Sequence, residues 1–559
     1  MRPSLKITLL SILLVVALPV QATDRPGRAA IASAHPLASA AGMDVLEAGG
    51  NAFDAAVAVS AAQAVVVPYG AGLGGGGFWL LQRAEDRFET LVDGREKAPL
   101  AATADMYLDA SGQPITKASR EGPLAAGIPG MPAALVYIAE TYGVLPLSRS
   151  LEPAIGLARD GFPVWPRLRA GLVARRTTLA RSPVASEVFL VEGEAPGLGH
   201  VIVQPQLAET LGRIAAEGHD GFYRGPVAHA LVEGAQAAGG IWTLEDLEAY
   251  SVVEREPIVA TWRGTRALMA PPPSAGGVAL ANIFQILSSY DLNRHNRVEQ
   301  VHLIVEAMRR AFRDRALYLG DPDFVSVPVE RLTHPFYAAG QRASIRLDRA
   351  TPSASLPGFK VVSGGDQTTH FSILDTEGNR VAGTQSLNSW FGSGYMEPTT
   401  GVMLNNEMDD FSVKPGVQNL YQLVGAGANA IAPGKRMLSS MSPTILESER
   451  GVAILGTPGG SRIVSMVALA TLEWMRGGDA TSMVSLPRFH HQYLPDKLFH
   501  EPDAFSEEEL AALRALGHEP SRVSRFYGNM QVVTWDFETG KVEAVSDPRG
   551  QGDAKVRVY

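Results

Sequence analysis

One stretch of the chain, residues 363–411, decides the fold and reads SGGDQTTHFSILDTEGNRVAGTQSLNSWFGSGYMEPTTGVMLNNEMDDF. A glycine-rich segment leads into two threonines, and the β-branched and aromatic residues at 370–375 predict a strand. Residues 376–379 are typical of a turn, and residues 381–387 predict the return strand. The stretch therefore predicts a β-hairpin centred on Glu377.

This hairpin would bring two hydroxyl side chains together, because its register places Thr368 opposite Ser386 within about one residue. A cross-strand Thr–Ser pair is common and by itself predicts no chemistry. A threonine hydroxyl becomes a nucleophile when a base lies beside it, and its own α-amine is such a base once the chain is cut before it. The bond between Gln367 and Thr368, which follows the glycine-rich segment, is a candidate cut site. Acidic residues downstream, Glu407 and 409–410, could hold a cationic group of a substrate.

Four motifs in one order resemble the γ-glutamyltransferase (γ-glutamyltranspeptidase) family of N-terminal-nucleophile hydrolases. They are TTHFS at 368–372, NNEMDDFS at 405–412, LSSMSP at 438–443 and GTPGGSR at 456–462. The likeness extends from about Ala29 to the C-terminus, and the ordered set is far more specific than any single motif. The resemblance implies an α+β fold, a four-layer αββα sandwich built from both fragments of one precursor. A signal peptide at 1–22 would precede a large fragment, 23–367, and a small catalytic fragment, 368–559.

The resemblance also implies a role for each site residue. Thr368 would be the nucleophile and Ser386 would orient it, while backbone N–H groups of Gly459 and Gly460 would hold the oxyanion. Three residues, Arg95, Ser439 and Ser440, would bind the α-carboxylate of a glutamyl group. Three others, Asn388, Glu407 and Asp410, would bind its α-ammonium group. Tyr421 would close over the site from a lid loop.

These roles predict an autoprocessed enzyme that cleaves γ-glutamyl amides such as glutathione and passes the glutamyl group to water or to amino acid and peptide amines. An alternative is a cephalosporin (glutaryl) acylase of the same family, whose substrate lacks an α-ammonium partner for Asp410. A third hypothesis is an exported binding protein for γ-glutamyl peptides that is never cut. No cofactor is expected. The pair His490–His491 suggests a metal at first sight, but no cysteine or carboxylate stands at ligand spacing, so no metal is expected either.

Composition restricts the class of protein further. The chain has 559 residues and is 46% hydrophobic, which is enough for a large core. Its net charge is −9 without a basic cluster, which argues against nucleic acid as a partner. It has no cysteine, so neither a disulfide nor a thiol nucleophile is available.

The N-terminus is typical of a secretory signal. Arg2 and Lys6 precede an apolar core at 7–20, and Val20-Gln21-Ala22 fits the small-residue pattern of a signal-peptide cleavage site. A retained signal anchor is the alternative, but the apolar run of about 14 residues is shorter than the ~20 that span a bilayer. We therefore expect a soluble exported protein, periplasmic or secreted, with no membrane contact after signal removal.

Helical patterns flank the predicted strands. Residues 36–47 and 52–66 predict alanine-rich helices, separated by glycines and an Asn51 N-cap. A glycine tract at 70–77 lacks the Gly-Lys-Ser/Thr ending of a phosphate loop, so it predicts close backbone packing before a buried strand rather than nucleotide binding. A long helix at 298–318 carries four arginines, which we expect to form a solvated face without a chemical role.

Overall fold

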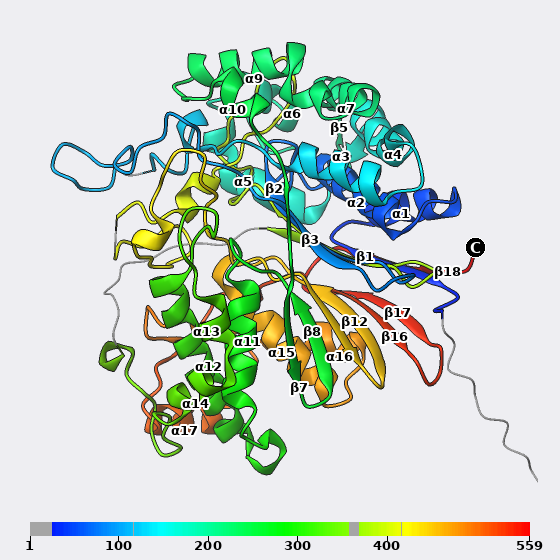
Figure 1. The fold of residues 1–559 in the computed structure, drawn as a ribbon. Coiled ribbons are helices and arrows are strands. Elements are labelled where there is room, and N and C mark those ends of the chain that lie inside the picture. The colour runs from blue at the N-terminus through cyan, green and yellow to red at the C-terminus, as the bar shows by residue number, and fades with distance from the viewer. Residues whose placement is uncertain (1–24, 116, 357–367, 415) are drawn as a thin grey trace, which may run out of the picture.

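A computed structural model describes residues 25–115, 117–356, 368–414 and 416–559 (Figure 1). The predicted signal segment and Gln367 lie outside these residues. Among the described helices, not one is long and apolar enough to cross a membrane.

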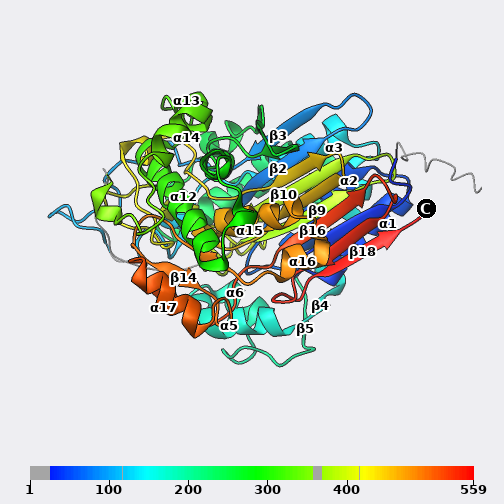
Figure 2. The same ribbon diagram turned by 90° about the horizontal axis from the view of Figure 1, so that it is seen from below.

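Two antiparallel sheets form the centre of the molecule (Figure 1). The first has seven strands in the order β18 (Asp553–Arg557), β1 (Ala29–Ser33), β9 (Thr369–Leu374), β10 (Arg380–Ser386), β2 (Gly76–Gln82), β3 (Glu89–Gly94) and β6 (Val253–Arg255). The second has six, in the order β17 (Val542–Ser546), β16 (Gln531–Asp536), β12 (Gly451–Gly456), β11 (Thr444–Ser448), β8 (Thr265–Met269) and β7 (Ile258–Trp262). Figure 2 shows that strands of the two sheets run in similar directions, as in aligned sheet packing.

Both faces of each central strand are buried, because each sheet packs against the other sheet on one side and against helices on the other. In β2, Phe78 and Leu80 contribute to the core between the sheets, whereas Trp79 and Leu81 contribute to the core under the helices. In β12 the same alternation places Ile454 between the sheets and its neighbours under helices. This period of two follows from the pleat, since successive side chains leave opposite faces. The expected mixed fold of helices and sheets is therefore confirmed.

The hairpin predicted around Glu377 forms in the structure. Strands β9 and β10 pair with Thr369 opposite Gln385 and His370 opposite Thr384, which is the register expected for a turn at Glu377. Strand β1 from the N-terminal part pairs with β9, and β2 pairs with β10. Segments from both sides of the predicted cut therefore share one sheet, so both would be needed for one core.

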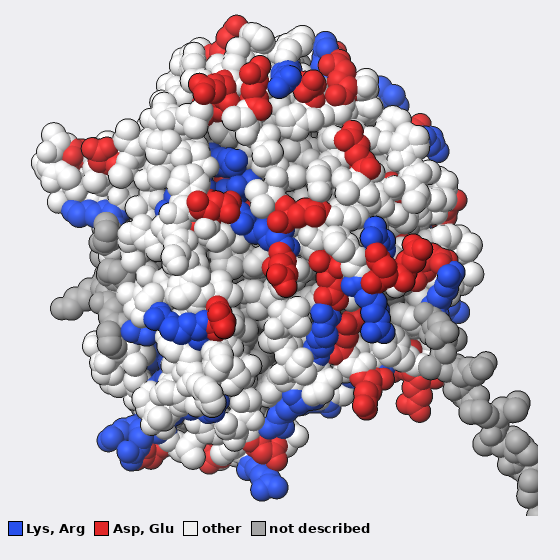
Figure 3. Space-filling model, in the orientation of Figure 1, with Lys and Arg blue, Asp and Glu red and all other residues white. Residues whose placement is uncertain are grey.

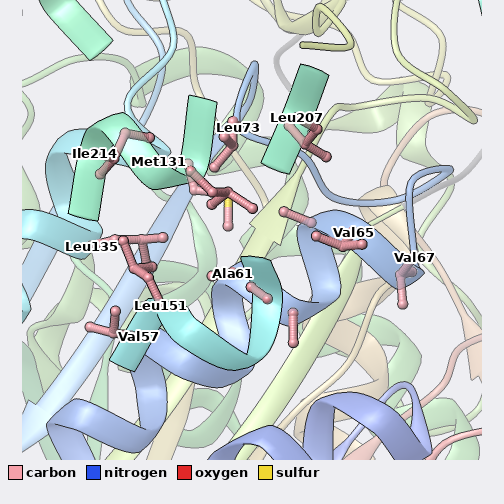
Figure 4. Close-up of a cluster of buried hydrophobic side chains, with 14 of the residues drawn as sticks. Val57, Ala61, Val65, Val67, Leu73, Met131, Leu135, Leu151, Leu207 and Ile214 are labelled. Atoms are coloured by element: carbon pink, nitrogen blue, oxygen red, sulfur yellow. The ribbon is translucent and has the colours of Figure 1, made fainter. Parts of the chain in front are cut away.

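Helices from the N-terminal half lie on the outer side of the first sheet, where the first three contact its strands and most of the others pack farther out (Figure 1). They are α1 (Pro36–Glu47), α2 (Ala52–Val66), α3 (Met131–Tyr142), α4 (Leu147–Asp160), α5 (Pro166–Leu179), α6 (Pro183–Phe189), α7 (Pro205–Glu217), α8 (Asp220–Tyr223), α9 (Gly225–Ala237) and α10 (Leu244–Glu248). Helix α2 starts at the predicted Asn51 cap and is buried along its whole length. Figure 4 shows side chains of α2, α3, α4 and α7 packed together, which explains why its alanine-rich sequence has no polar face.

Helices that follow β8 lie on the outer side of the second sheet, where three of them contact its strands and the others pack farther out. They are α11 (Gly276–Leu287), α12 (Arg297–Tyr318), α13 (Val329–Thr333), α14 (Pro335–Arg342), α15 (Ile463–Met475), α16 (Ala480–Ser485) and α17 (Glu507–Ala515). The short strands are β4 (Phe162–Pro163), β5 (Val201–Ile202), β13 (Phe489–His490), β14 (Leu498–His500) and β15 (Pro520–Arg522). On the face that Figure 3 shows, acidic and basic side chains are interspersed.

Helix α12 corrects one expectation. Its arginines do not form a solvated face, because Arg309, Arg310 and Arg315 are buried. Arg309 pairs with Glu306 and Asp496, and Arg310 pairs with Glu306. We call Glu306, Arg309, Arg310 and Asp496 the anchor cluster, because it holds the chain at 351–353. Within that segment, Thr351 N donates to Glu306 Oε1 (3.0 Å) and Ser353 N to Asp496 Oδ2 (2.7 Å). The four arginines of this helix wrongly predicted a solvent-exposed face, because arginines paired with carboxylates can be buried inside the protein.

Candidate active site

A pocket of about 270 Å³ opens where the central hairpin ends, and we call it the central pocket. Thr368 immediately precedes β9 and Ser386 ends β10, so the hairpin register carries both hydroxyls to the same wall. Thr368 is 7% exposed. The predicted residues that line this pocket are Arg95, Thr368, Ser386, Asn388, Glu407, Asp410, Tyr421, Ser439, Ser440 and Gly460. The fold thus gathers residues that are more than 300 positions apart in the chain.

Arg95 is the charged centre of this pocket. It follows the end of β3, and its N–H donates to Asp93 Oδ1 (2.9 Å), which fixes the start of the side chain. Its guanidinium contacts Asp410 Oδ2 (2.5 Å) and Glu407 Oε2 (2.7 Å), while Glu96 Oε2 lies 3.6 Å away. The residues expected to divide between carboxylate and ammonium recognition are therefore paired with each other.

The carboxylates around Arg95 outnumber the cations. Burial raises the pKa of Glu96, Glu407 and Asp410 to about 7 in each case, because the attraction of Arg95 does not offset the loss of water. Glu407 Oε1 and both oxygens of Glu96 are buried without a hydrogen-bond partner in the described part of the chain. Such a site is short of positive charge, so a bound ammonium group would stabilise it.

Asn388 presents a further acceptor at the pocket wall. Its backbone has φ of 73°, a left-handed conformation that asparagine tolerates better than most residues. Its N–H donates to Ser386 Oγ (2.7 Å) and its Nδ2 to the carbonyl of Asn406 (2.9 Å). Its Oδ1 is buried and has no partner among the described residues. Asn388 therefore has one acceptor for which the described residues supply no donor.

Tyr421 lines the central pocket, and its role as a lid stays a prediction. Its hydroxyl donates to the carbonyl of Asn388 (2.6 Å). The loop is held by Asp409, which accepts from Leu420 N (2.7 Å) and from Ser119 Oγ (2.6 Å). Asp409 does not line the central pocket, so of the two adjacent aspartates only Asp410 can meet a substrate there.

The segment between β12 and α15 contributes two glycines in left-handed conformations. Gly459 has φ of 144° and Gly460 φ of 55°, and a Cβ on Gly459 would lie 2.6 Å from Met466 Cε. Within the described residues, neither N–H donates to a protein acceptor. Gly460 lines the central pocket and Gly459 borders a neighbouring cavity. Two free N–H groups beside a hydroxyl can stabilise a tetrahedral oxyanion.

Comparison with known proteins gives the family. The model of the family described as gamma-glutamyltranspeptidase matches residues 38–557. The chain belongs to this family.

Relatives and solved structures agree with that membership. The chain is 41% identical to the glutathione hydrolase proenzyme of Escherichia coli over 94% of this chain and 90% of the relative, and 43% identical to that of a Pseudomonas species over 88% and 86%. The crystal structure of cephalosporin acylase from Bacillus halodurans matches with a TM-score of 0.83 at 28% identity, covering 98% of this chain and 99% of that one. Helicobacter pylori gamma-glutamyltranspeptidase matches with a TM-score of 0.57 at 40% identity, covering 58% and 93%.

The sequence of this γ-glutamyltranspeptidase family member did not predict one of the residues that line the pocket. Arg315 on α12 lines the central pocket, and its Nε donates to Ser440 Oγ (3.3 Å). Burial lowers the pKa of Arg315 to about 10. The Ser439 hydroxyl accepts from Met441 N (3.1 Å), and a hydroxyl in this role can still donate its proton. The helical pattern contains no signal that separates Arg315 from the partly buried Arg313, so only the packing of α12 reveals it.

The paired histidines have separate partners. His490 bonds with Ser465 Oγ (2.7 Å) and Gln492 Oε1 (2.7 Å), whereas His491 contacts Asp496 in the anchor cluster (3.1 Å). The parts of the chain that the structure describes contain no group of three or more potential ligands that could hold a metal ion.

Proposed function

We propose that this chain is an autoprocessed γ-glutamyl hydrolase and transferase that acts on γ-glutamyl amides such as glutathione. The observation that carries the proposal is the presence of Thr368, buried Arg95 and buried Asp410 in one pocket. A hydroxyl nucleophile, a clamp for a carboxylate and a site for an ammonium group are what a γ-glutamyl donor requires.

Maturation would begin with attack of Thr368 Oγ on the carbonyl carbon of Gln367. The peptide C–N bond breaks, an ester forms, and the Thr368 nitrogen takes the proton that the hydroxyl loses. Water then hydrolyses the ester, which leaves a carboxylate on residue 367 and a free α-amine on Thr368. The products are fragments 23–367 and 368–559, which we propose remain together as a heterodimer in a four-layer αββα sandwich. The sharing of one sheet by β1, β9 and β18 supports this view.

Turnover would use the new α-amine as the base. It accepts the Thr368 hydroxyl proton while Oγ attacks the γ-carbonyl carbon of the donor, and it then gives that proton to the departing amine. Ser386 would orient the nucleophile. The N–H groups of Gly459 and Gly460 would stabilise the oxyanion in both steps. The γ-glutamyl ester passes to water or to an acceptor amine, whose attack on the ester carbon releases the Thr368 oxygen.

Recognition would separate the ion pairs of the empty pocket. The α-carboxylate of the donor would bind Arg95, Ser439 and Ser440, while its α-ammonium would bind Asn388, Glu407 and Asp410. The excess of carboxylates in the pocket favours this assignment. A glutaryl group would bring its own carboxylate to these residues but no ammonium group to pair with them. The high structural similarity to a cephalosporin acylase keeps glutaryl amides as the second candidate substrate.

The N-terminal sequence supports export, and we propose a periplasmic or secreted location after removal of residues 1–22. Partners would be small γ-glutamyl donors and amine acceptors, without cofactor, metal or nucleic acid.

The proposal can be tested by analysing the purified protein on a denaturing gel and by intact-mass spectrometry. We expect two fragments, with Thr368 as the first residue of the smaller one, and a single uncut and inactive chain for Thr368→Ala. Hydrolysis of a γ-glutamyl anilide should exceed that of a glutaryl anilide. An active protein with an intact bond before Thr368 would refute the mechanism. Faster hydrolysis of the glutaryl anilide would instead favour a glutaryl acylase.

A further inference from the structure

Arg315 is a buried cation of the central pocket that the proposed mechanism does not use. It lies in the last turn of α12 (labelled in Figure 1), lines the central pocket and is 4% exposed. Its Nε donates to Ser440 Oγ (3.3 Å), whereas its two terminal nitrogens meet no acceptor among the described residues. Burial lowers its pKa only to about 10, so the guanidinium stays protonated at neutral pH.

We propose that Arg315 is a second positive group for the α-carboxylate of the donor, on which it acts through its charge and through the hydroxyl of Ser440. The inference rests on the proposed function and adds a positioning and specificity-determining residue to it.

The surroundings of Arg95 show why a second cation is needed. The guanidinium of Arg95 already contacts Glu407 (2.7 Å) and Asp410 (2.5 Å), and Glu96 lies 3.6 Å away. Once a donor ammonium group keeps these carboxylates ionised, an α-carboxylate that approaches Arg95 meets more negative than positive charge. Arg315 forms no ion pair within the described part of the chain, and Asp410 acts on it only from beyond ion-pair distance. Its charge can therefore offset the excess.

The two serines of the pocket are polarised for an anion. The Ser440 oxygen accepts from Arg315, and the Ser439 oxygen accepts from Met441 N (3.1 Å). Neither hydroxyl donates to an acceptor within the described residues, so each keeps its proton for a ligand. A hydroxyl that accepts from a cation is also a stronger donor. Two such donors beside a guanidinium suit a carboxylate and not an ammonium group.

Both arginines hold the segment that carries these serines. Arg95 Nε donates to the carbonyl of Met437 (3.3 Å), and Arg315 Nε donates to Ser440 Oγ (3.3 Å). One arginine follows β3 and the other ends α12, so residues 437–440 are fixed from two separate elements. A prearranged segment loses little entropy when it binds a ligand.

Two other roles for Arg315 would give different kinetics. It could support the fold alone, or it could keep Asp410 ionised for the ammonium group. Either role would affect donors with and without an α-carboxylate alike, because both kinds of donor carry the ammonium group. Discrimination between carboxylate and carboxamide is therefore the property that separates the proposal from these alternatives.

The test compares a γ-glutamyl anilide with its α-carboxamide analogue, in which a neutral amide replaces the α-carboxylate. We expect the acid-to-amide ratio of kcat/KM to fall about 10- to 100-fold in Arg315→Gln, mostly through KM, as is typical when a hydrogen-bonded charge is lost. Arg315→Lys keeps the charge but not the Nε donor, so its ratio should fall less. Arg310→Gln is the matched control, because Arg310 is a buried arginine of the same helix outside the central pocket, and it should keep the wild-type ratio.

A second measurement is independent of turnover. The Kd of L-glutamate should rise in processed Arg315→Gln enzyme, whereas the Kd of its α-amide should not. Combined with Ser440→Ala, the effect on glutamate binding should be less than additive, because Arg315 acts partly through Ser440. If Arg315→Gln is not processed, Arg315→Lys decides by the same ratio.

Equal losses for acid and amide ligands, or an unchanged ratio in the Arg315 variants, would overturn the inference. Absence of anilide hydrolysis in the wild-type enzyme would instead refute the proposed function itself, so the two failures are distinguishable.

Discussion

The molecule contains two clusters of arginine and carboxylate, largely buried, that differ in charge balance. In the anchor cluster, Arg309 and Arg310 meet Glu306 and Asp496, and several of the remaining donors and acceptors bind the backbone and side chains of residues 351–353. In the central pocket, Arg95 and Arg315 stand among Glu96, Glu407 and Asp410, and several carboxylate oxygens have no partner among the described residues.

The pKa values record this difference. Burial alone would raise the pKa of Glu306, but Arg309 and Arg310 lower it to about 2. In the central pocket burial outweighs Arg95, and the pKa of Asp410 rises to about 7. A cluster whose charges are all matched holds a segment in place, whereas a cluster with surplus carboxylate is prepared for a cation from outside. Under the proposed function, the excess of carboxylates in the central pocket, rather than the presence of buried charge as such, would serve to bind an ammonium group.

The largest expected effect follows substitution of Arg95, the arginine that contacts Glu407 and Asp410 in the central pocket. Arg95→Gln removes the fork that would bind the α-carboxylate and leaves Glu407 and Asp410 without their cation. We expect kcat/KM for a γ-glutamyl anilide to fall about 10³-fold, about 4 kcal/mol, because a buried charged contact is lost. Steady-state kinetics on processed enzyme measures this loss. A change below about tenfold would remove Arg95 from donor binding.

The matching change in the balanced cluster should give the opposite pattern. Arg309→Gln breaks contacts with Glu306, Ser353 and Asp496, and it should lower the free energy of unfolding by about 3 kcal/mol. The KM of the processed enzyme should stay within about twofold of wild type. Thermal unfolding and anilide kinetics check both parts. If Arg309→Gln altered KM as strongly as stability, the two clusters would not be separate in function.

The central hairpin could be predicted from the sequence because local rules are strong there. Turn residues at 376–379 set the register that places Thr368 and Ser386 at one wall, and this register is observed in β9 and β10. The same is true of Asn51, where one polar side chain at a helix start predicts a cap that the structure contains. In each case the information lies within a few residues.

The contacts that distinguish the two clusters could not be predicted in this way. Arg309 and Arg315 stand six positions apart on α12, yet one belongs to the anchor cluster and the other lines the central pocket. Which arginine meets which carboxylate depends on segments almost 200 residues away, such as Asp496. Strand β18, formed by residues 553–557, was likewise missed, because its polar sequence becomes a strand only by pairing with β1.

The surplus carboxylate predicts how pH governs binding. With the pKa of Asp410 and Glu407 raised to about 7, both are largely protonated at low pH and bind an ammonium group only when ionised. The Kd of L-glutamate, as product, should therefore fall about tenfold per ionised group between roughly pH 6 and pH 8.

Calorimetry in buffers of different ionisation enthalpy would also detect proton release on binding. The empty enzyme should lose stability over the rise from about pH 4.5 to 7, because its folded carboxyls keep protons that the unfolded chain has released. Asp410→Asn should flatten the binding profile. A Kd that is constant across this range would show that the ionised carboxylates are not needed for binding.

The smallest expected effect concerns Tyr421, whose hydroxyl donates a neutral hydrogen bond at the central pocket. Tyr421→Phe keeps the ring but removes the donor to the Asn388 carbonyl. A neutral hydrogen bond contributes about 0.5–1.5 kcal/mol, so KM for the donor should rise about two- to tenfold, with little change in stability. Tyr395→Phe is the matched control, since its hydroxyl donates to the Gly234 carbonyl (2.8 Å) outside the central pocket. Equal effects of the two substitutions would mean that the Tyr421 hydroxyl contributes only to folding, and that the pocket retains its donor through charge alone.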